Sequence, residues 1–127
     1  MATCTIVEFK DVEIVYTDVS YSTIEDTMAI MDVNHDIIKG KPLNSVLSLV
    51  NVKQVSVNGP LLAKLRKNIK RNNPYILATA VIGLNPFTKV MLDTLIAFTG
   101  RKIIALDSYE EARLWLHHQK EKANVTQ

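Results

Sequence analysis

The side chains in this sequence that could do metal, nucleophilic or acid-base chemistry are few and widely spread. The histidines are His35, His117 and His118, and Cys4 is the single cysteine. A metal site needs ligands that converge, whereas the adjacent His117 and His118 point to different faces of a helix. A catalytic cysteine needs a base within hydrogen-bond reach, and no base is near Cys4 in sequence. We therefore expect no metal site and no enzymatic activity.

Paired carboxylates occur at Glu25-Asp26 and at Glu110-Glu111. Both pairs fall in the first turn of a predicted helix, where a negative charge meets the positive end of the helix dipole. This position explains the pairs without catalysis. Neither of the Gly-rich phosphate-binding patterns, GxGxxG or GxxxxGK, is present in the sequence. We therefore expect no cofactor.

The length and composition of the chain predict a single domain, which we take to span residues 1–127. A length of 127 residues and a hydrophobic fraction of 47% suit a globular domain with a real core. The polar stretch 120–127 predicts a frayed tail. A single cysteine suits a reducing compartment, and the sequence has neither a signal-peptide pattern at its start nor a run of about 18 apolar residues. These features predict a cytoplasmic protein with no membrane span.

Charge is distributed unevenly along the chain. Residues 1–50 hold eight acidic and three basic side chains, a net charge of −5, and residues 51–127 hold five acidic and twelve basic, a net charge of +7. One predicted helix carries five of the basic residues, namely Lys64, Arg66, Lys67, Lys70 and Arg71. We expect a solvated outer face rather than a nucleic-acid site, because no recognition helix or exposed aromatic set accompanies them. An acidic protein surface or an anionic lipid headgroup is the remaining alternative.

Strand-like and helix-like segments alternate along the rest of the chain. Ser22 and Glu25 form a predicted capping box at one helix start, and Ser108 belongs to another. Asn58 and Asn85 are predicted caps, because a proline follows each within two residues. The predicted strands are 4–9, 12–17, 46–52, 75–82 and 102–106, and the predicted helices begin near residues 23, 59, 86 and 109.

This order of elements predicts an α/β fold. Strands that alternate with helices imply a mostly parallel sheet joined by right-handed crossovers. The first two strands, with Lys10-Asp11 as a two-residue turn, add an antiparallel hairpin. We expect a single-domain mixed, mostly parallel sheet of four to five strands covered by helices. The methionines Met28, Met31 and Met91 are expected to fill its core.

One edge of the predicted sheet is the place to look for a binding site. Ligands of open α/β sheets lie outside the carboxyl ends of the strands, where the loops 56–60, 83–86 and 107–108 should meet. The alternative is that these loops are plain capped turns. Arg101 has no evident structural need, and we expect it to pair with a carboxylate such as Asp107 or to contact a ligand. The candidate binding edge comprises Ser56, Asn58, Gly59, Gly83, Asn85 and Arg101.

The second half of the chain resembles bacterial SpoIIAA-like, or STAS-like, proteins. The resemblance covers roughly the last half, and the first half agrees in its order of elements. The matching residues are turns, caps and core positions, so the pattern is moderately specific. They are Pro74-Tyr75, Val81-Ile82-Gly83, Thr99-Gly100-Arg101, Glu110-Glu111-Ala112 and Trp115-Leu116.

The resemblance implies a non-enzymatic domain with a mixed sheet and packed helices. The wider superfamily includes anti-sigma-factor antagonists, which are switched by phosphorylation of a serine in an Asp-Ser-Ser-Gly motif, and related domains that hold lipids. Here Gly59 and Pro60 fall near the first two positions of that motif, so the motif is absent. Ser56 is the serine candidate for a phosphosite, because its phosphate would lie beside a helix N-terminus.

Three hypotheses follow for the function. The first is a regulatory or protein-interaction module, with another protein or a second copy of the chain as its partner. The second is a carrier of a small apolar, lipid-like or anionic ligand, held between the sheet and a movable helix. The third is a phospho-regulated anti-sigma-factor antagonist. An exposed apolar patch would favour the first, and an apolar cavity of a few hundred Å³ would favour the second.

Overall fold

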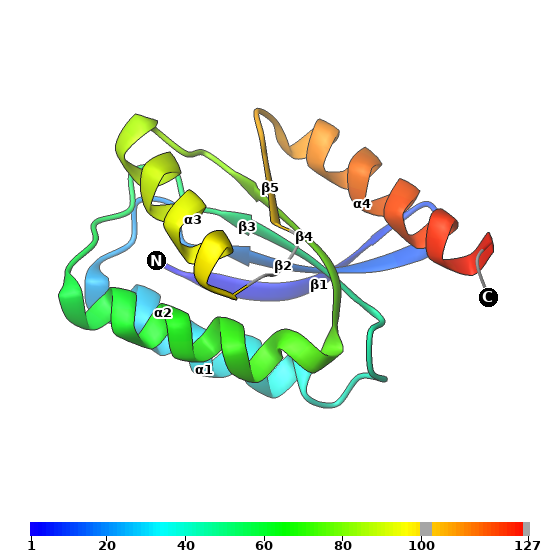
Figure 1. The fold of residues 1–127 in the computed structure, drawn as a ribbon, viewed down its shortest axis with the longest axis horizontal. Helices are drawn as coiled ribbons and strands as arrows, with labels where there is room; N and C mark the ends of the chain where they lie inside the picture. Colours follow the sequence, from blue (N-terminus) through cyan, green and yellow to red (C-terminus); the bar gives the residue numbers. More distant parts are fainter. Residues whose placement is uncertain (100–102, 126–127) are drawn as a thin grey trace.

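The computed structural model describes residues 1–99 and 103–125 of the chain. In this part of the chain five strands and four α-helices follow one another in the predicted order (Figure 1). A single 3-10 turn, Asn73–Tyr75, separates the second helix from the fourth strand. The elements are β1 (Thr3–Phe9), β2 (Val12–Asp18), α1 (Ile24–Ile38), β3 (Val46–Asn51), α2 (Gly59–Asn72), β4 (Ile76–Ile82), α3 (Pro86–Thr99), β5 (Ile103–Leu106) and α4 (Tyr109–Val125).

The five strands form one sheet in the order β1-β2-β3-β4-β5. β1 and β2 pair antiparallel through the predicted two-residue turn, in which Lys10 takes a left-handed φ of 56°. The pairs from β2 to β5 are all parallel. The prediction of a mixed, mostly parallel sheet is therefore confirmed, with five strands in the part that the structure describes.

The sequential strand order places three helices on one face of the sheet. Each crossover from β2 to β5 steps one strand in the same direction, and right-handed crossovers that step the same way put their helices on the same face. α1, α2 and α3 accordingly share one face. α4 follows the last strand and returns over the other face, as Figure 1 shows for α4 against α1 and α2.

Alternation along the strands gives each face its own set of side chains. On β3, Leu47 and Leu49 face α4, where they pack with Ala112 and Leu116 in one buried cluster. The intervening Ser48 and Val50 face the three-helix layer. The two faces of the sheet therefore have separate cores.

Three of the four predicted helix caps are confirmed. The Asn58 side chain accepts a hydrogen bond from the Leu61 amide, the Asn85 side chain from the Thr88 amide, and the Ser108 hydroxyl from the Glu111 amide.

The predicted capping box of Ser22 is wrong. Thr23 caps α1, and its hydroxyl accepts from the Asp26 amide. Ser22 is buried one residue earlier in a tight turn, where its amide donates to the Val19 carbonyl and its hydroxyl to the Ser20 carbonyl. Ser22 and Thr23 are adjacent hydroxyl residues. The Ser22 hydroxyl bonds within the turn, and the Thr23 hydroxyl caps the helix.

The C-terminal helix extends through most of the segment 120–127 that was expected to be a frayed tail, since α4 ends at Val125. Gly100 and Arg101 lie outside the described residues. Within the described part of the chain, none of the helices combines the length and the apolar character that a membrane span requires.

Candidate functional site

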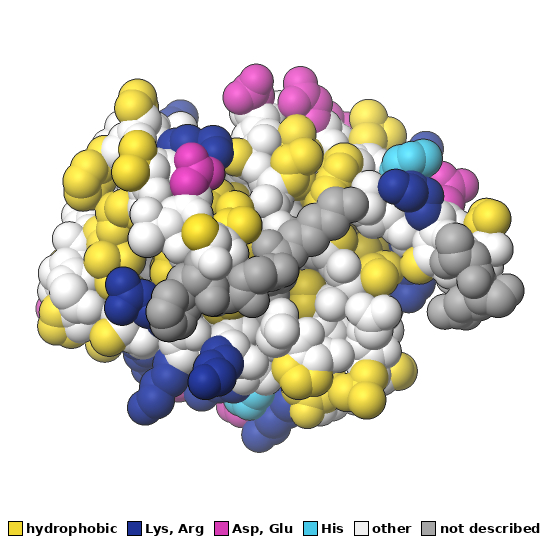
Figure 2. All heavy atoms as spheres, in the orientation of Figure 1, with side chains coloured by type: hydrophobic (Ala, Val, Ile, Leu, Met, Phe, Trp, Pro, Cys, Tyr) yellow, Lys and Arg dark blue, Asp and Glu magenta, His cyan; other side chains and the backbone are white. Residues whose placement is uncertain are grey.

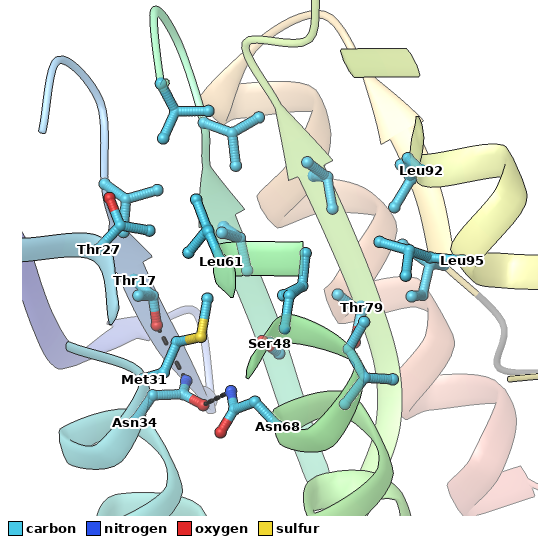
Figure 3. Close-up of a pocket in the computed structure, with 18 of the residues that line it drawn as sticks. Thr17, Thr27, Met31, Asn34, Ser48, Leu61, Asn68, Thr79, Leu92 and Leu95 are labelled. Atoms are coloured by element: carbon cyan, nitrogen blue, oxygen red, sulfur yellow. Dashed lines mark hydrogen bonds between the residues drawn. The ribbon is translucent and has the colours of Figure 1, made fainter. Parts of the chain in front are cut away.

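A cavity of about 180 Å³ lies between the sheet and the layer formed by α1, α2 and α3. Its floor is the face of β2 to β5 that α4 does not cover. Figure 3 shows side chains from all three helices and from the floor strands converging on this space. The lining is mostly apolar, with Met31, Leu61, Leu65, Met91, Leu92 and Leu95 among the helix residues.

The spacing between sheet and helices explains the cavity. α4 lies close along the backbone of β2, β3, β4 and β5, and α1 lies close to β1 and β2, whereas the main helix neighbours of α2 are α1 and α3. The floor strands also place short side chains, Ser48 and Thr79, at central positions. Helices that stand off from the sheet over short floor residues leave space that aliphatic side chains only partly fill.

Three hydroxyl groups stand on this apolar floor, one from each of three adjacent strands. They belong to Thr17, Ser48 and Thr79, and all three residues are buried (Figure 3). Ser48 and Thr79 are direct partners in the β3–β4 register. The Thr17 hydroxyl has partners, because Asn34 Nδ2 donates to it at 3.0 Å and Cys4 Sγ lies 3.3 Å away.

Three buried carboxamides, which we call the asparagine cluster, form one end of the cavity. The cluster comprises Asn34 from α1 and both Asn68 and Asn72 from α2. Asn34 Oδ1 accepts from Asn68 Nδ2 at 3.2 Å and from Asn72 Nδ2 at 2.9 Å. Because Asn34 also donates to Thr17, the cluster ties both helices to the sheet.

The asparagine cluster continues to the surface through an ion pair between the helices. Arg71 Nε donates to Asn68 Oδ1, and Arg71 Nη2 donates to Asp32 Oδ1 at 2.9 Å. Lys64 Nζ donates to the other oxygen of Asp32 at 2.9 Å. These two bonds, that of Lys64 first, lower the pKa of Asp32 below its ordinary value of 3.8. Two members of the basic cluster therefore hold α2 to α1.

Several residues of the predicted binding edge have structural duties. The side chains of Asn58 and Asn85 cap helices. The backbone amide of Asn85 donates to the Thr88 hydroxyl, so this amide is engaged within the chain. Gly83 has a φ of +84°, and a Cβ there would lie 2.7 Å from the Lys53 amide nitrogen. Gly83 therefore lets two loops meet closely, which needs no ligand.

The structure assigns no role to the other members of the predicted edge. Ser56 is exposed in the loop between β3 and α2, and Gly59 is exposed at the first turn of α2. Arg101 lies outside the described residues, so its pairing with Asp107 stays a prediction. The sheet also runs in sequential order and so has no point where the order reverses, which is where ligands of open α/β sheets bind.

The histidines and the cysteine lie in separate places. His35 Nδ1 is 2.7 Å from Asn72 Oδ1, and His117 contacts Asp11 and Glu121 on the opposite side of the sheet. Cys4 lies beside Thr17. Among residues 1–99 and 103–125, no three His, Cys, Asp or Glu side chains are grouped as metal ligands would be.

A space for a ligand between the sheet and a helix was one of the alternatives, but the residues that line the cavity were not predicted as a site. Met31 and Met91 were expected only to fill the core, yet both line the cavity. The available signal was polar residues at inward positions: Ser48 and Thr79 in otherwise apolar strands, and Asn68 on the apolar stripe of a basic helix.

Comparison with known proteins gives a fold and no activity. No family model matches the chain, and no curated protein matches it. A solved structure, an uncharacterised protein of the DUF3478 family with a SpoIIAA-like fold from Shewanella loihica PV-4, is similar with a TM-score of 0.74 and 14% sequence identity. The similarity covers 91% of this chain and 93% of that one. The chain therefore has the SpoIIAA-like fold that its sequence resembled.

Proposed function

We propose that this chain is a non-enzymatic module that binds a small, largely apolar ligand in the cavity beneath α1, α2 and α3. The observation that carries the proposal is the cavity itself, about 180 Å³ with mostly apolar walls and a few polar groups. Binding sites for small molecules have this composition. The volume is below the few hundred Å³ expected of a carrier, so the proposed ligand is correspondingly small.

The polar groups of the cavity support binding over catalysis. They are hydroxyls and carboxamides from Thr, Ser and Asn side chains. Neither group takes up or releases a proton near neutral pH, so neither serves as a general acid or base there. Such groups orient a ligand by hydrogen bonds.

Native mass spectrometry of the protein purified from its own host tests this function. We expect one small molecule per chain in the wild type. Val81→Phe adds bulk to the cavity floor and should abolish that mass, whereas Val33→Phe makes the same change on the outer side of α1 and should keep it. A wild-type chain that is bare under gentle conditions would contradict the proposal.

A second candidate is a protein-interaction module that uses the start of α3. Phe87 and Val90 are 69% and 65% exposed there, one turn apart. Figure 2 shows hydrophobic side chains gathered over this end of the molecule. Sedimentation equilibrium tests for a homodimer: the wild type should be heavier than Phe87→Ser, and equal monomer masses would count against self-association. The phospho-regulated alternative has less support, because the Asp-Ser-Ser-Gly motif is absent.

A further inference from the structure

The hydroxyl of Thr79 stands out on the cavity floor. The Thr79 side chain is 5% exposed, and its Oγ1 atom has no hydrogen-bond partner among the described residues. A buried hydroxyl without a partner is unfavourable, and most buried polar side chains in proteins are paired. A group on the ligand is the natural partner for a hydroxyl that lines a cavity.

The other unpaired buried atom in the described chain has a different setting. Arg113 Nε lies on the α4 side, and its guanidinium stacks over the rings of Phe9 and Tyr109 at 4.5 and 4.6 Å. Arg113 is not among the residues that line the cavity. Thr79 therefore combines an unpaired buried oxygen with a side chain that lines the cavity, which Arg113 does not.

The two remaining hydroxyls on the floor show why Thr79 is the anchor. Thr17 already accepts from Asn34 and lies beside Cys4, so its hydroxyl is engaged. Ser48 lies directly across from Thr79 in the sheet register, which leaves a polar pair at the centre of an apolar floor. A ligand centred over β3 and β4 meets one polar spot surrounded by aliphatic groups.

The volume limits the size of the ligand. An apolar protein cavity of about 150 Å³ accepts benzene, and this cavity measures about 180 Å³. It therefore has room for one ring with one or two further non-hydrogen atoms. A long acyl chain would extend beyond this volume.

We propose that the ligand is a ring-sized apolar molecule that carries one hydroxyl or carbonyl group, and that this group hydrogen-bonds the Thr79 hydroxyl. This inference rests on the proposed function of the cavity. A site with a buried hydrogen-bonding group discriminates against an analogue that lacks the matching polar atom, because the group then stays unpaired. Thr79 therefore determines how much more tightly the site binds a hydroxylated molecule than its apolar analogue.

The test compares two probes of nearly equal shape, p-cresol and p-xylene, which differ by a hydroxyl in place of a methyl. Calorimetric titration gives the ratio of their dissociation constants for the wild type, Thr79→Val and Thr79→Ser. We expect the preference for p-cresol to fall about tenfold in Thr79→Val, the size expected for one buried hydrogen bond. Thr79→Ser keeps the hydroxyl and should keep the preference.

The outcomes separate the two proposals. If both probes bind and Thr79→Val leaves their ratio unchanged, the role of Thr79 is overturned while the cavity stays a binding site. If neither probe binds the wild type, the cavity is no binding site for molecules of this size, and both proposals fail. Binding of p-xylene to Thr79→Val shows that this variant is folded. If Thr79→Val does not fold, an unchanged preference in Thr79→Ser together with its loss in Thr79→Ala supports the role, and a preference retained in Thr79→Ala refutes it.

Discussion

The two faces of the sheet are built from the same strands and differ in nearly every other respect. On the α4 face, Ala112 and Leu116 are fully buried against Leu47 and Leu49, and the centre of the packing is apolar. On the three-helix face, a cavity separates the sheet from its helices, and polar groups line part of it. One face therefore supplies stability, and the other keeps space and hydrogen-bonding groups available.

The contrast teaches that burial alone does not identify a core. Thr79 and Leu49 are both buried in central strands, but the atoms around them differ. Leu49 is enclosed by close-packed neighbours, whereas Thr79 adjoins open space. Leu116 and Leu92 allow the two faces to be compared directly, and the polar residues of the three-helix face test what holds that face together.

The largest expected difference is between Leu116→Ala and Leu92→Ala. Removal of a fully packed leucine leaves a new void, so we expect Leu116→Ala to lower the free energy of unfolding by about 4 kcal/mol. Leu92 already faces the cavity and has fewer partner atoms to lose, so we expect about 2 kcal/mol there. Urea unfolding followed by circular dichroism measures both. Equal losses would show that the two faces are packed alike.

The asparagine cluster should give the next largest effect. Asn34→Ala removes the acceptor of Asn68 and Asn72 and a donor to Thr17. Unpaired buried amides are costly, so we expect a loss of about 3 kcal/mol. Asn124→Ala, on the exposed side of α4, is the matched control and should change stability little. A small effect of Asn34→Ala would mean that the cluster does not hold the helix layer to the sheet.

The two threonines on the cavity floor should respond in opposite directions. Thr17→Val removes a hydroxyl that is hydrogen-bonded, and we expect a loss of about 1 kcal/mol. Thr79→Val removes one that has no partner, and we expect a gain of about 1 kcal/mol in the free protein. Thermal and urea unfolding of the ligand-free variants decide the signs. Destabilisation by both substitutions would indicate that Thr79 has a partner after all.

The smallest effect concerns the surface ion pair of Asp32 and appears as a pH dependence. The pKa of Asp32 is lowered in the folded state, so its carboxylate contributes stability above its unfolded value, near 3.8. That contribution is lost as the pH falls through the lowered folded value. We expect Asp32→Asn to be less stable than the wild type at pH 6, with the difference shrinking towards pH 2. Asp36→Asn on the same helix is the matched control for the loss of one carboxylate, because Asp36 forms an exposed ion pair with Lys39.

The elements of the fold were predictable because their signals are local. Asn58 and Asn85 with their following prolines mark helix starts, and alternation of strands and helices sets the parallel sheet. The one wrong cap, Ser22 instead of Thr23, is a shift of one residue between two hydroxyl side chains that can both cap a helix. Such a choice depends on the turn before the helix, which the sequence pattern does not specify.

The candidate site was not predictable in the same way, because its parts are distant in sequence. Asn34 meets Asn72 across 38 positions of the chain. The cavity depends on how far α2 and α3 stand from the sheet, and no local pattern encodes that distance. The edge loops contain the glycines and asparagines from which a binding edge was predicted, yet Gly83 allows close packing and Asn85 caps a helix.

The sequential order of the strands has a consequence for how the chain acquires its structure during synthesis. Each strand pairs with the one made just before it, and each of α1, α2 and α3 emerges between the two strands that it joins. The three-helix side can therefore assemble stepwise as the polypeptide leaves the ribosome. The opposite side stays bare until α4 has been made, so Leu47 and Leu49 are exposed to water in every shorter nascent chain. We expect nascent chains that stop before Tyr109 to attract chaperones that recognise apolar surface, and α4 to end that dependence.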